Sequence, residues 1–155
     1  MNRTVEQKIM HLRNRLDDAD MFLGPPATRF DIDTLNSAVL SEFSEVLPRQ
    51  YLDFLKCFDG LISNGVFIYS SRQHKFPDSD EFSHDFMEIN RISRDVDFMK
   101  DFLVFGDSDQ DEYVLDLSEN SFQVRDKQAF DNVYENFESF DELLEHMVNL
   151  IIERA

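Results

Sequence analysis

The sequence predicts an α+β fold in which helices pack on a mostly antiparallel sheet, with an extra helix at the N-terminus. Three observations lead to this prediction. Apolar residues recur at helical spacing through the first 58 positions, strand-like runs dominate the second half, and a helical pattern closes the 155-residue chain. Such segregation of helices and strands is typical of the α+β class, and a chain of this length usually forms one domain, at most with a small appendage.

The first helix is predicted over residues 4–20, where apolar side chains three and four positions apart share one face. The Gly24-Pro25-Pro26 sequence must end any helix, because proline cannot continue one. We therefore expect residues 1–26 to form an N-terminal helix with a stiff connector, and residues 27–155 to form the α+β domain. The pattern does not say whether the helix packs on that domain or on a neighbouring molecule.

Two further helices are predicted before residue 60. The first spans residues 33–46, and the second starts at Leu47-Pro48, since proline is tolerated in a first helical turn. This second helix runs to about Phe58, and Asp59-Gly60 provides its end and a turn.

The pattern then changes to that of strands and loops. Residues 66–69 are a short run of β-prone residues, which favours a buried strand. Residues 71–84 are polar and contain a proline, so we expect a loop there. A helix is predicted within residues 85–99, where apolar residues again recur at helical spacing.

Closely spaced strands are predicted over residues 102–105, 113–117 and 122–124, and we expect a brief further segment at 133–137. Their connections are short, which favours antiparallel hairpins over crossovers through a helix. The closing helix begins at Ser139, which has a glutamate three positions further on, as in a capping box.

The charge of the chain is strongly negative and unevenly distributed. Lys and Arg number 15 against 32 Asp and Glu, a net charge of −17, which argues against a nucleic-acid-binding protein because such affinity rests on basic surfaces. Residues 1–77 carry 9 basic and 10 acidic side chains, whereas residues 78–155 carry 6 basic and 22 acidic ones. Two explanations stay open: the charge provides solubility, or it forms a landing surface for a basic partner protein.

The sequence also bears on the environment of the protein. A single cysteine, Cys57, excludes a disulfide framework and a cysteine-rich zinc site. No stretch approaches the roughly 18–20 apolar residues that a membrane-spanning helix needs, and the charged N-terminus lacks the apolar core of a signal peptide. We therefore expect a cytoplasmic protein whose partner is neither a membrane nor a nucleic acid.

The densest group of potential metal ligands is the acidic segment 107–112. A calcium-binding EF-hand loop that starts at Asp107 needs Gly at its sixth position and Glu at its twelfth, where this chain has Glu112 and Ser118. The segment therefore fits an acidic hairpin turn or a partner-binding loop better than a calcium site.

Other patterns of catalysis and cofactor binding are missing from the sequence. The four histidines are too far apart for an HExxH-type metal pair, and there is no G-x-S-x-G nucleophile elbow or glycine-rich phosphate loop. We expect no enzymatic activity, no catalytic residue, no cofactor and no bound metal. A hydrolase that uses two carboxylates stays open only if the fold has a deep cleft.

Three short motifs, taken in their order, resemble the SUKH superfamily, named after a yeast cell-wall-synthesis regulator and its bacterial relatives. The segment Leu47-Pro48-Arg49-Gln50-Tyr51-Leu52-Asp53-Phe54-Leu55 is similar to its LP-x-x-[YF]-x-x-[FL]-L helix, and Asp59-Gly60 is similar to the turn that follows. Residues 102–107 with 111–117 resemble its strand–Gly-Asp–strand core, and residues 140–144 resemble its closing helix. The resemblance covers roughly residues 31–150 and is closest to the small bacterial YrhA-like branch.

The resemblance implies a protein-binding domain that performs no catalysis. Many bacterial members are immunity proteins that bind and block a cognate toxin domain, often a nuclease. A nuclease attracts phosphates through a basic face, so the negative charge of the second half agrees with this role. The alternative is a general adaptor or regulatory module unrelated to toxins, as the yeast relatives suggest.

We therefore expect the partner to be a cognate basic toxin domain, bound by a monomer or a weak homodimer. The expected contacts are acidic residues of two loops, Asp78, Asp80, Glu81, Asp85, Asp107, Asp109, Asp111 and Glu112.

Overall fold

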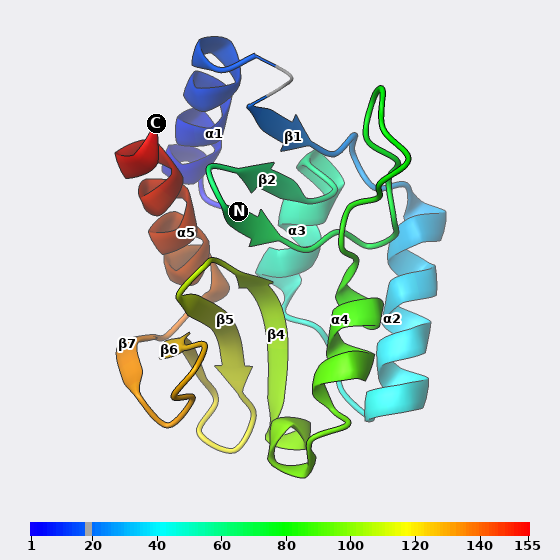
Figure 1. Ribbon diagram of the computed structural model, residues 1–155. Coiled ribbons are helices and arrows are strands. Elements are labelled where there is room, and N and C mark those ends of the chain that lie inside the picture. The colour runs from blue at the N-terminus through cyan, green and yellow to red at the C-terminus, as the bar shows by residue number, and fades with distance from the viewer. Residues whose placement is uncertain (18–19) are drawn as a thin grey trace.

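The computed structural model describes residues 1–17 and 20–155, and its elements confirm the α+β prediction (Figure 1). The helices are α1 (Arg3–Arg15), α2 (Arg29–Phe43), α3 (Arg49–Cys57), α4 (Phe86–Ser93) and α5 (Phe140–Arg154), with one 3₁₀ helix, η1 (Asp97–Asp101). The strands are β1 (Met21–Leu23), β2 (Leu61–Ser63), β3 (Val66–Ile68), β4 (Phe102–Asp107), β5 (Asp111–Asp116), β6 (Ser121–Asp126) and β7 (Val133–Phe137). They form one antiparallel sheet in the order β1-β2-β3-β4-β5-β6-β7.

Three differences from the sequence prediction lie in the first half of the chain. α2 spans Arg29–Phe43 rather than residues 33–46. α1 ends at Arg15 rather than at residue 20, and Leu16 already has extended dihedral angles, φ −103° and ψ 146°. The carboxylate of Asp17 follows, and negative charge at a helix C-terminus opposes the helix dipole. Residues 18–19 of the predicted helix lie outside the described residues. β1 and β2 are unexpected strands, because three residues each are too few to show a period.

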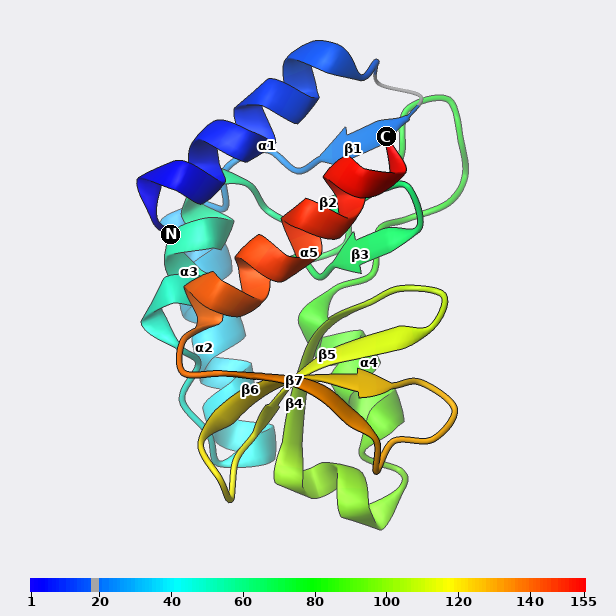
Figure 2. The same cartoon turned by 90° about the vertical axis from the view of Figure 1, so that its left-hand side faces the viewer.

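α1 lies beside α5, although the two helices belong to opposite ends of the chain (Figure 2). Val5, Ile9 and Leu12 of α1 are fully buried in the common core. The Nζ atom of Lys8 donates a hydrogen bond to Oδ1 of Asn149 on α5, at 2.9 Å. The segment before the Gly-Pro-Pro connector is therefore packed on the rest of the chain.

A cluster of aromatic side chains joins the helices to the sheet. The ring of Tyr51 on α3 lies 4.9 Å from the ring of Phe105 on β4 and 5.2 Å from that of Phe140 on α5, in edge-to-face contacts. The Tyr51 hydroxyl donates a hydrogen bond to the carbonyl oxygen of Tyr69 at 2.7 Å, so its polar atom is satisfied although the ring is fully buried. The tyrosine of the Leu-Pro motif is thus part of the core.

β4 passes so close to β3 that one of its positions accepts only glycine. A Cβ atom on Gly106 would lie 2.3 Å from the carbonyl oxygen of Phe67. On the side of β4 that faces α4, the backbone of Val104 forms hydrogen bonds with a buried side chain of α4 and not with another strand. Its N–H donates to Oδ1 of Asn90 at 2.8 Å, and Nδ2 of Asn90 donates to its carbonyl oxygen at 2.8 Å. These contacts fix β4 between a strand and a helix.

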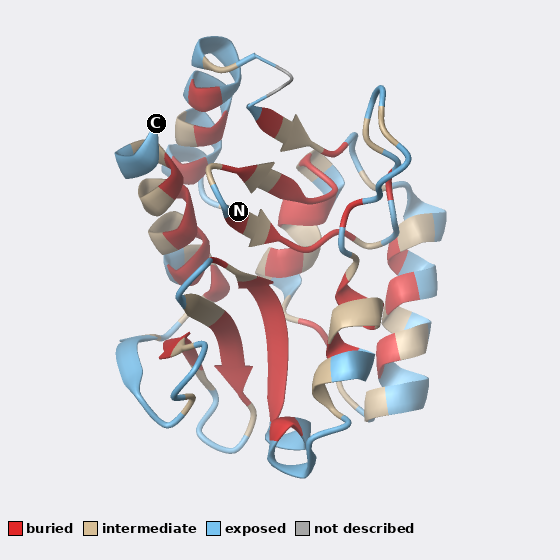
Figure 3. Ribbon diagram, in the orientation of Figure 1, coloured by how far each residue is buried: buried red, intermediate tan, exposed pale blue. Residues whose placement is uncertain are grey.

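The two edge strands of the sheet differ in exposure. β1 is buried or half-buried, and the ring of Phe76 lies 5.2 Å from the ring of Phe22. β7 pairs with β6 alone, and four of its five residues are exposed. Figure 3 shows β7 as an exposed band beside a largely buried sheet. The sheet therefore ends in an accessible edge at β7.

Candidate functional site

A buried pair of hydrogen-bonded side chains anchors the loop that carries the first group of predicted contacts. Asp59 is fully buried, and its Oδ2 atom lies 2.6 Å from Nε2 of His74. The same carboxylate accepts hydrogen bonds from the backbone N–H and the hydroxyl of Ser71, at 2.7 and 2.8 Å. The aspartate of the Asp-Gly turn thus bonds to the start of loop 71–84.

This arrangement leaves the Asp59–His74 pair without the geometry of a catalytic triad. The Ser71 hydroxyl donates its hydrogen bond to the aspartate rather than to the histidine, so the serine–histidine contact of a triad is not formed. The loop is closed further along by the hydrogen bond from the Ser83 N–H to the His74 carbonyl oxygen, at 2.8 Å. The pair therefore holds the loop in place.

The acidic residues of loop 71–84 extend from this anchor. Asp78, Asp80 and Glu81 are exposed, and Asp78 has a positive φ of 56°, as turns often require. Asp85 has a different role, because its side chain accepts a hydrogen bond from the Glu88 N–H and caps α4. Three of the four predicted contacts in this segment are thus free for a partner.

The second predicted group, around the β4–β5 turn, is partly paired within the molecule. Asp107 lies 3.3 Å from Nζ of Lys127, and Asp109 lies 2.7 Å from a guanidinium nitrogen of Arg154. The hydrogen bond from Arg154 lowers the pKa of Asp109. Two of the four carboxylates therefore already have a cation beside them, which weakens their electrostatic attraction for a basic partner.

The other two carboxylates of this turn are half-buried. Burial raises the pKa of Glu112, although Lys127 acts in the opposite direction. Burial likewise raises the pKa of Asp111, against the effect of His146. In the described part of the chain, no hydrogen bond or ion pair joins this turn to loop 71–84. The two predicted groups are thus two separate acidic features.

A third acidic feature was missed by the sequence prediction. Glu135 on β7 and Glu142 and Glu145 on α5 line one shallow groove of ≈ 300 Å³, and the Glu138 N–H donates to Glu142 Oε2 at 3.2 Å. We call these four residues the β7–α5 acidic surface. A signal for it exists in the sequence, since residues 128–153 contain 7 acidic side chains and no Lys or Arg.

The charge of the β7–α5 acidic surface is little compensated. Lys8 lies 3.6 Å from Glu145. Among the described residues, Glu135, Glu138 and Glu142 have no cationic partner within 4.0 Å. A cation brought by another molecule would therefore meet carboxylates that are not yet paired.

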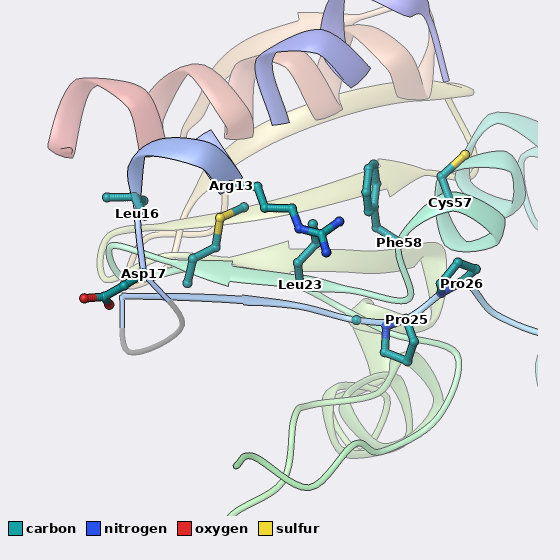
Figure 4. A pocket seen from close by; sticks show the side chains of 10 residues that line it. Arg13, Leu16, Asp17, Leu23, Pro25, Pro26, Cys57 and Phe58 are labelled. Atoms are coloured by element: carbon teal, nitrogen blue, oxygen red, sulfur yellow. The ribbon is translucent and has the colours of Figure 1, made fainter. Parts of the chain in front are cut away.

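Two further hollows lie in the part of the chain that the structure describes. One of ≈ 400 Å³ lies between α1 and the Gly-Pro-Pro connector, and both Arg13 and Leu23 line it (Figure 4). Cys57 also lines it, but burial raises the pKa of its thiol, with a smaller effect of Glu6, so the reactive thiolate is disfavoured. A wider hollow of ≈ 710 Å³ lies beside β1 and contains Asp20 and Asp78 among mostly apolar and amide residues.

Residues 1–17 and 20–155 contain neither a cluster of metal ligands nor a membrane-spanning helix. No three His, Cys, Asp or Glu side chains in these ranges are grouped closely enough to hold a metal ion. No helix in them is both long and apolar enough to cross a membrane.

The fold and its surfaces define an α+β domain with an antiparallel sheet and three acidic features. The family model of the SMI1 / KNR4 family (SUKH-1) matches residues 33–146, and the chain belongs to this family. The resemblance stated from the three motifs is thereby confirmed, whereas the YrhA-like branch stays a prediction. A search of curated proteins gives no match.

Proposed function

We propose that this chain is a non-catalytic immunity protein, which neutralises a cognate basic toxin domain by binding it in a stoichiometric complex. Membership of the SUKH-1 family supports a protein partner in general. The toxin, its basic character and the cytoplasmic site of action are parts of this proposal. A nuclease domain is the toxin class that agrees best with the charge, since its phosphate-binding face is basic.

The observation that carries the proposal is the uneven and only partly compensated negative charge. The half-chain 78–155 holds 22 acidic against 6 basic side chains. Many of its carboxylates lie on exposed loops, on β7 and on α5. Carboxylates on an open surface steer a basic partner toward the complex and cover its phosphate-binding groups.

The test is co-expression with the basic domain of a toxin encoded beside this chain. We expect growth to be restored, a 1:1 complex to co-purify, and the toxin's activity to be lost at equal molar amounts. A neighbouring partner that binds without being toxic would support the adaptor alternative instead. The immunity proposal is wrong if no adjacent gene encodes a toxin-like domain and no basic domain co-purifies.

Salt dependence separates steering by charge from apolar binding. The screening length falls from about 10 Å at ~0.1 M salt to a few Å at ~0.5 M, so we expect the dissociation constant to rise by at least about tenfold over this range. An affinity that does not change with salt would mean that apolar contacts dominate and that the charge serves solubility.

A further inference from the structure

The exposed edge strand β7 has one side to which no strand of the sheet is bonded. β7 is the last strand of the sheet and pairs with β6 on one side only. In an edge strand, alternate residues turn their N–H and C=O groups away from the sheet, where another strand can bond to them. Val133 and Tyr134 are 37% and 55% exposed, so the start of this strand is accessible at the surface.

Natural edge strands are usually protected against pairing by lysine, proline, a bulge or a covering helix. β7 has the sequence Val-Tyr-Glu-Asn-Phe, which contains neither lysine nor proline. Two protective features are present: the charge of Glu135, and a shift in the register with β6 between Val124 and Arg125. The pairing is regular from Glu135 to Phe137, a length equal to the three-residue pairing of β1 with β2. This part of the edge is open to another strand.

The opposite edge of the sheet is not equivalent. β1 is buried or half-buried, and two side chains of loop 71–84 lie against its central residue, Phe22. The ring of Phe76 is 5.2 Å from the ring of Phe22, and that of His74 is 6.0 Å from it. Of the two edge strands, β7 is therefore the one to which a strand of another molecule can bond.

The charge around β7 decides what kind of strand can add. Antiparallel pairing with a second copy of β7 would bring the Glu135 and Glu138 side chains of both copies together, and like charges on paired strands are destabilising. A strand with lysine or arginine side chains would instead meet carboxylates that have no cationic partner among the described residues, namely those of Glu135, Glu138 and Glu142. A basic strand of another protein is therefore favoured over a homodimer.

The two faces of β7 further define that strand. Glu135 and Phe137 face the groove shared with α5, which also contains Glu142 and Glu145. Asn136 faces the other way, where its Oδ1 accepts a hydrogen bond from Gln123 at 3.1 Å. Side chains alternate along a strand, so basic residues at every second position would all lie on the groove side.

We propose that β7 is a docking edge, to which a partner protein adds an antiparallel or parallel β-strand with basic side chains at alternate positions. The backbone of the added strand bonds to the open edge of β7, and its lysine or arginine side chains enter the groove between β7 and α5. This inference rests on the proposed function, since it assigns the surface by which a basic protein partner is bound.

The test uses a synthetic β-hairpin peptide whose outer strand alternates lysine and valine, added to the full-length chain. Its matched control has the same sequence and charge, but the outward amides of that strand are N-methylated and cannot donate hydrogen bonds. Hydrogen exchange of the chain is followed by NMR. We expect the first peptide to slow exchange at residues 133–137 and to bind at least about tenfold more tightly than the control.

Equal binding of the two peptides would overturn the proposal, because it would show adhesion by charge alone. Protection at β1 or at loop 71–84 in place of β7 would overturn it as well. The variant Glu135→Lys with Glu138→Lys should lower the affinity by at least about tenfold, whereas Asp80→Lys with Glu81→Lys, which makes the same charge change, should lower it less than about threefold.

The peptide experiment and the toxin experiment fail independently. If the co-expressed toxin domain binds but leaves β7 unprotected in the complex, the docking edge is wrong and the immunity proposal stands. If no toxin partner exists but the hairpin peptide protects β7 as described, the docking edge stands and the immunity proposal is wrong.

Discussion

The Nε2 atom of His74 lies 2.6 Å from Oδ2 of Asp59, and both side chains are buried. Asp59 lies just after the end of α3, whereas His74 belongs to the polar loop 71–84. The pair therefore ties a loop to the core through one carboxylate, which also accepts two hydrogen bonds from Ser71. Because a buried polar group is stable only when it is bonded, the loop and the Asp-Gly turn depend on each other.

Replacing Asp59 by alanine should destabilise the protein by about 2–4 kcal/mol, since it leaves the His74 ring nitrogen and the Ser71 N–H without their partner. Urea unfolding measures the loss, and hydrogen exchange should become faster within loop 71–84. The exposed Asp80→Asn variant is the control and should stay within about 0.5 kcal/mol of the wild type. A normal stability of D59A would show that the pair does not hold the loop.

The longer elements could be predicted from the sequence because their patterns repeat. α5 carries six buried apolar residues on one face and is preceded by a capping serine, and the prediction matched its start. β1 and β2 could not be predicted, because a three-residue strand is specified by its neighbours. Burial of His74 also escaped prediction, since its partner Asp59 lies 15 residues away. The boundary at residue 26 stays a prediction.

The side chain of Asn90 forms the two hydrogen bonds to the backbone of Val104 that a neighbouring strand would otherwise form. Removing this side chain should therefore lower the stability of the protein. The variant Asn90→Leu leaves the N–H and the C=O of Val104 unbonded inside the protein, so we expect a loss of about 2–4 kcal/mol. Thermal unfolding measures it. Asn14→Leu, in an exposed position of α1, is the matched control and should change the stability by less than about 0.5 kcal/mol.

Arg125 is a buried arginine whose shape matters as much as its charge. Its guanidinium lies 4.6 Å from the ring centre of Phe102 and 4.8 Å from that of Phe130, and it donates hydrogen bonds to Gln123 and to the Phe130 carbonyl oxygen. Lysine keeps the charge but lacks the planar fork, so Arg125→Lys should lose about 1–3 kcal/mol in urea unfolding. Arg29→Lys, on a side chain that is 96% exposed, should be neutral, and an equal effect of both would refute the stacking argument.

The candidate site was harder to predict than the fold, for a physical reason. Counting charges along the chain locates acidic loops, but it does not show which carboxylates have an internal cation. Asp107 and Asp109 are partly neutralised by Lys127 and Arg154, which are 20 and 45 positions away. The exposure of β7 is equally invisible in the sequence, since only the strand order places it at an edge. The absence of Lys and Arg from residues 128–153 was the available signal.

Glu112 should make the protein less stable as the pH rises, because burial raises the pKa of its carboxyl above the ordinary value of 4.5. The folded chain then keeps the proton at pH values where the unfolded chain has released it, so stability falls as the pH increases through this range. Glutamine never ionises, and Glu112→Gln should therefore be more stable than the wild type at pH 7. Urea unfolding at several pH values should show this advantage disappearing below pH 4.5. Asp109→Asn is the control of opposite sign, because the hydrogen bond from Arg154 lowers that pKa below 3.8: its stability deficit at pH 7 should close as the pH falls through 3.8. If both variants changed with pH in the same direction, burial and ion pairing would not be what sets these two carboxyl groups apart.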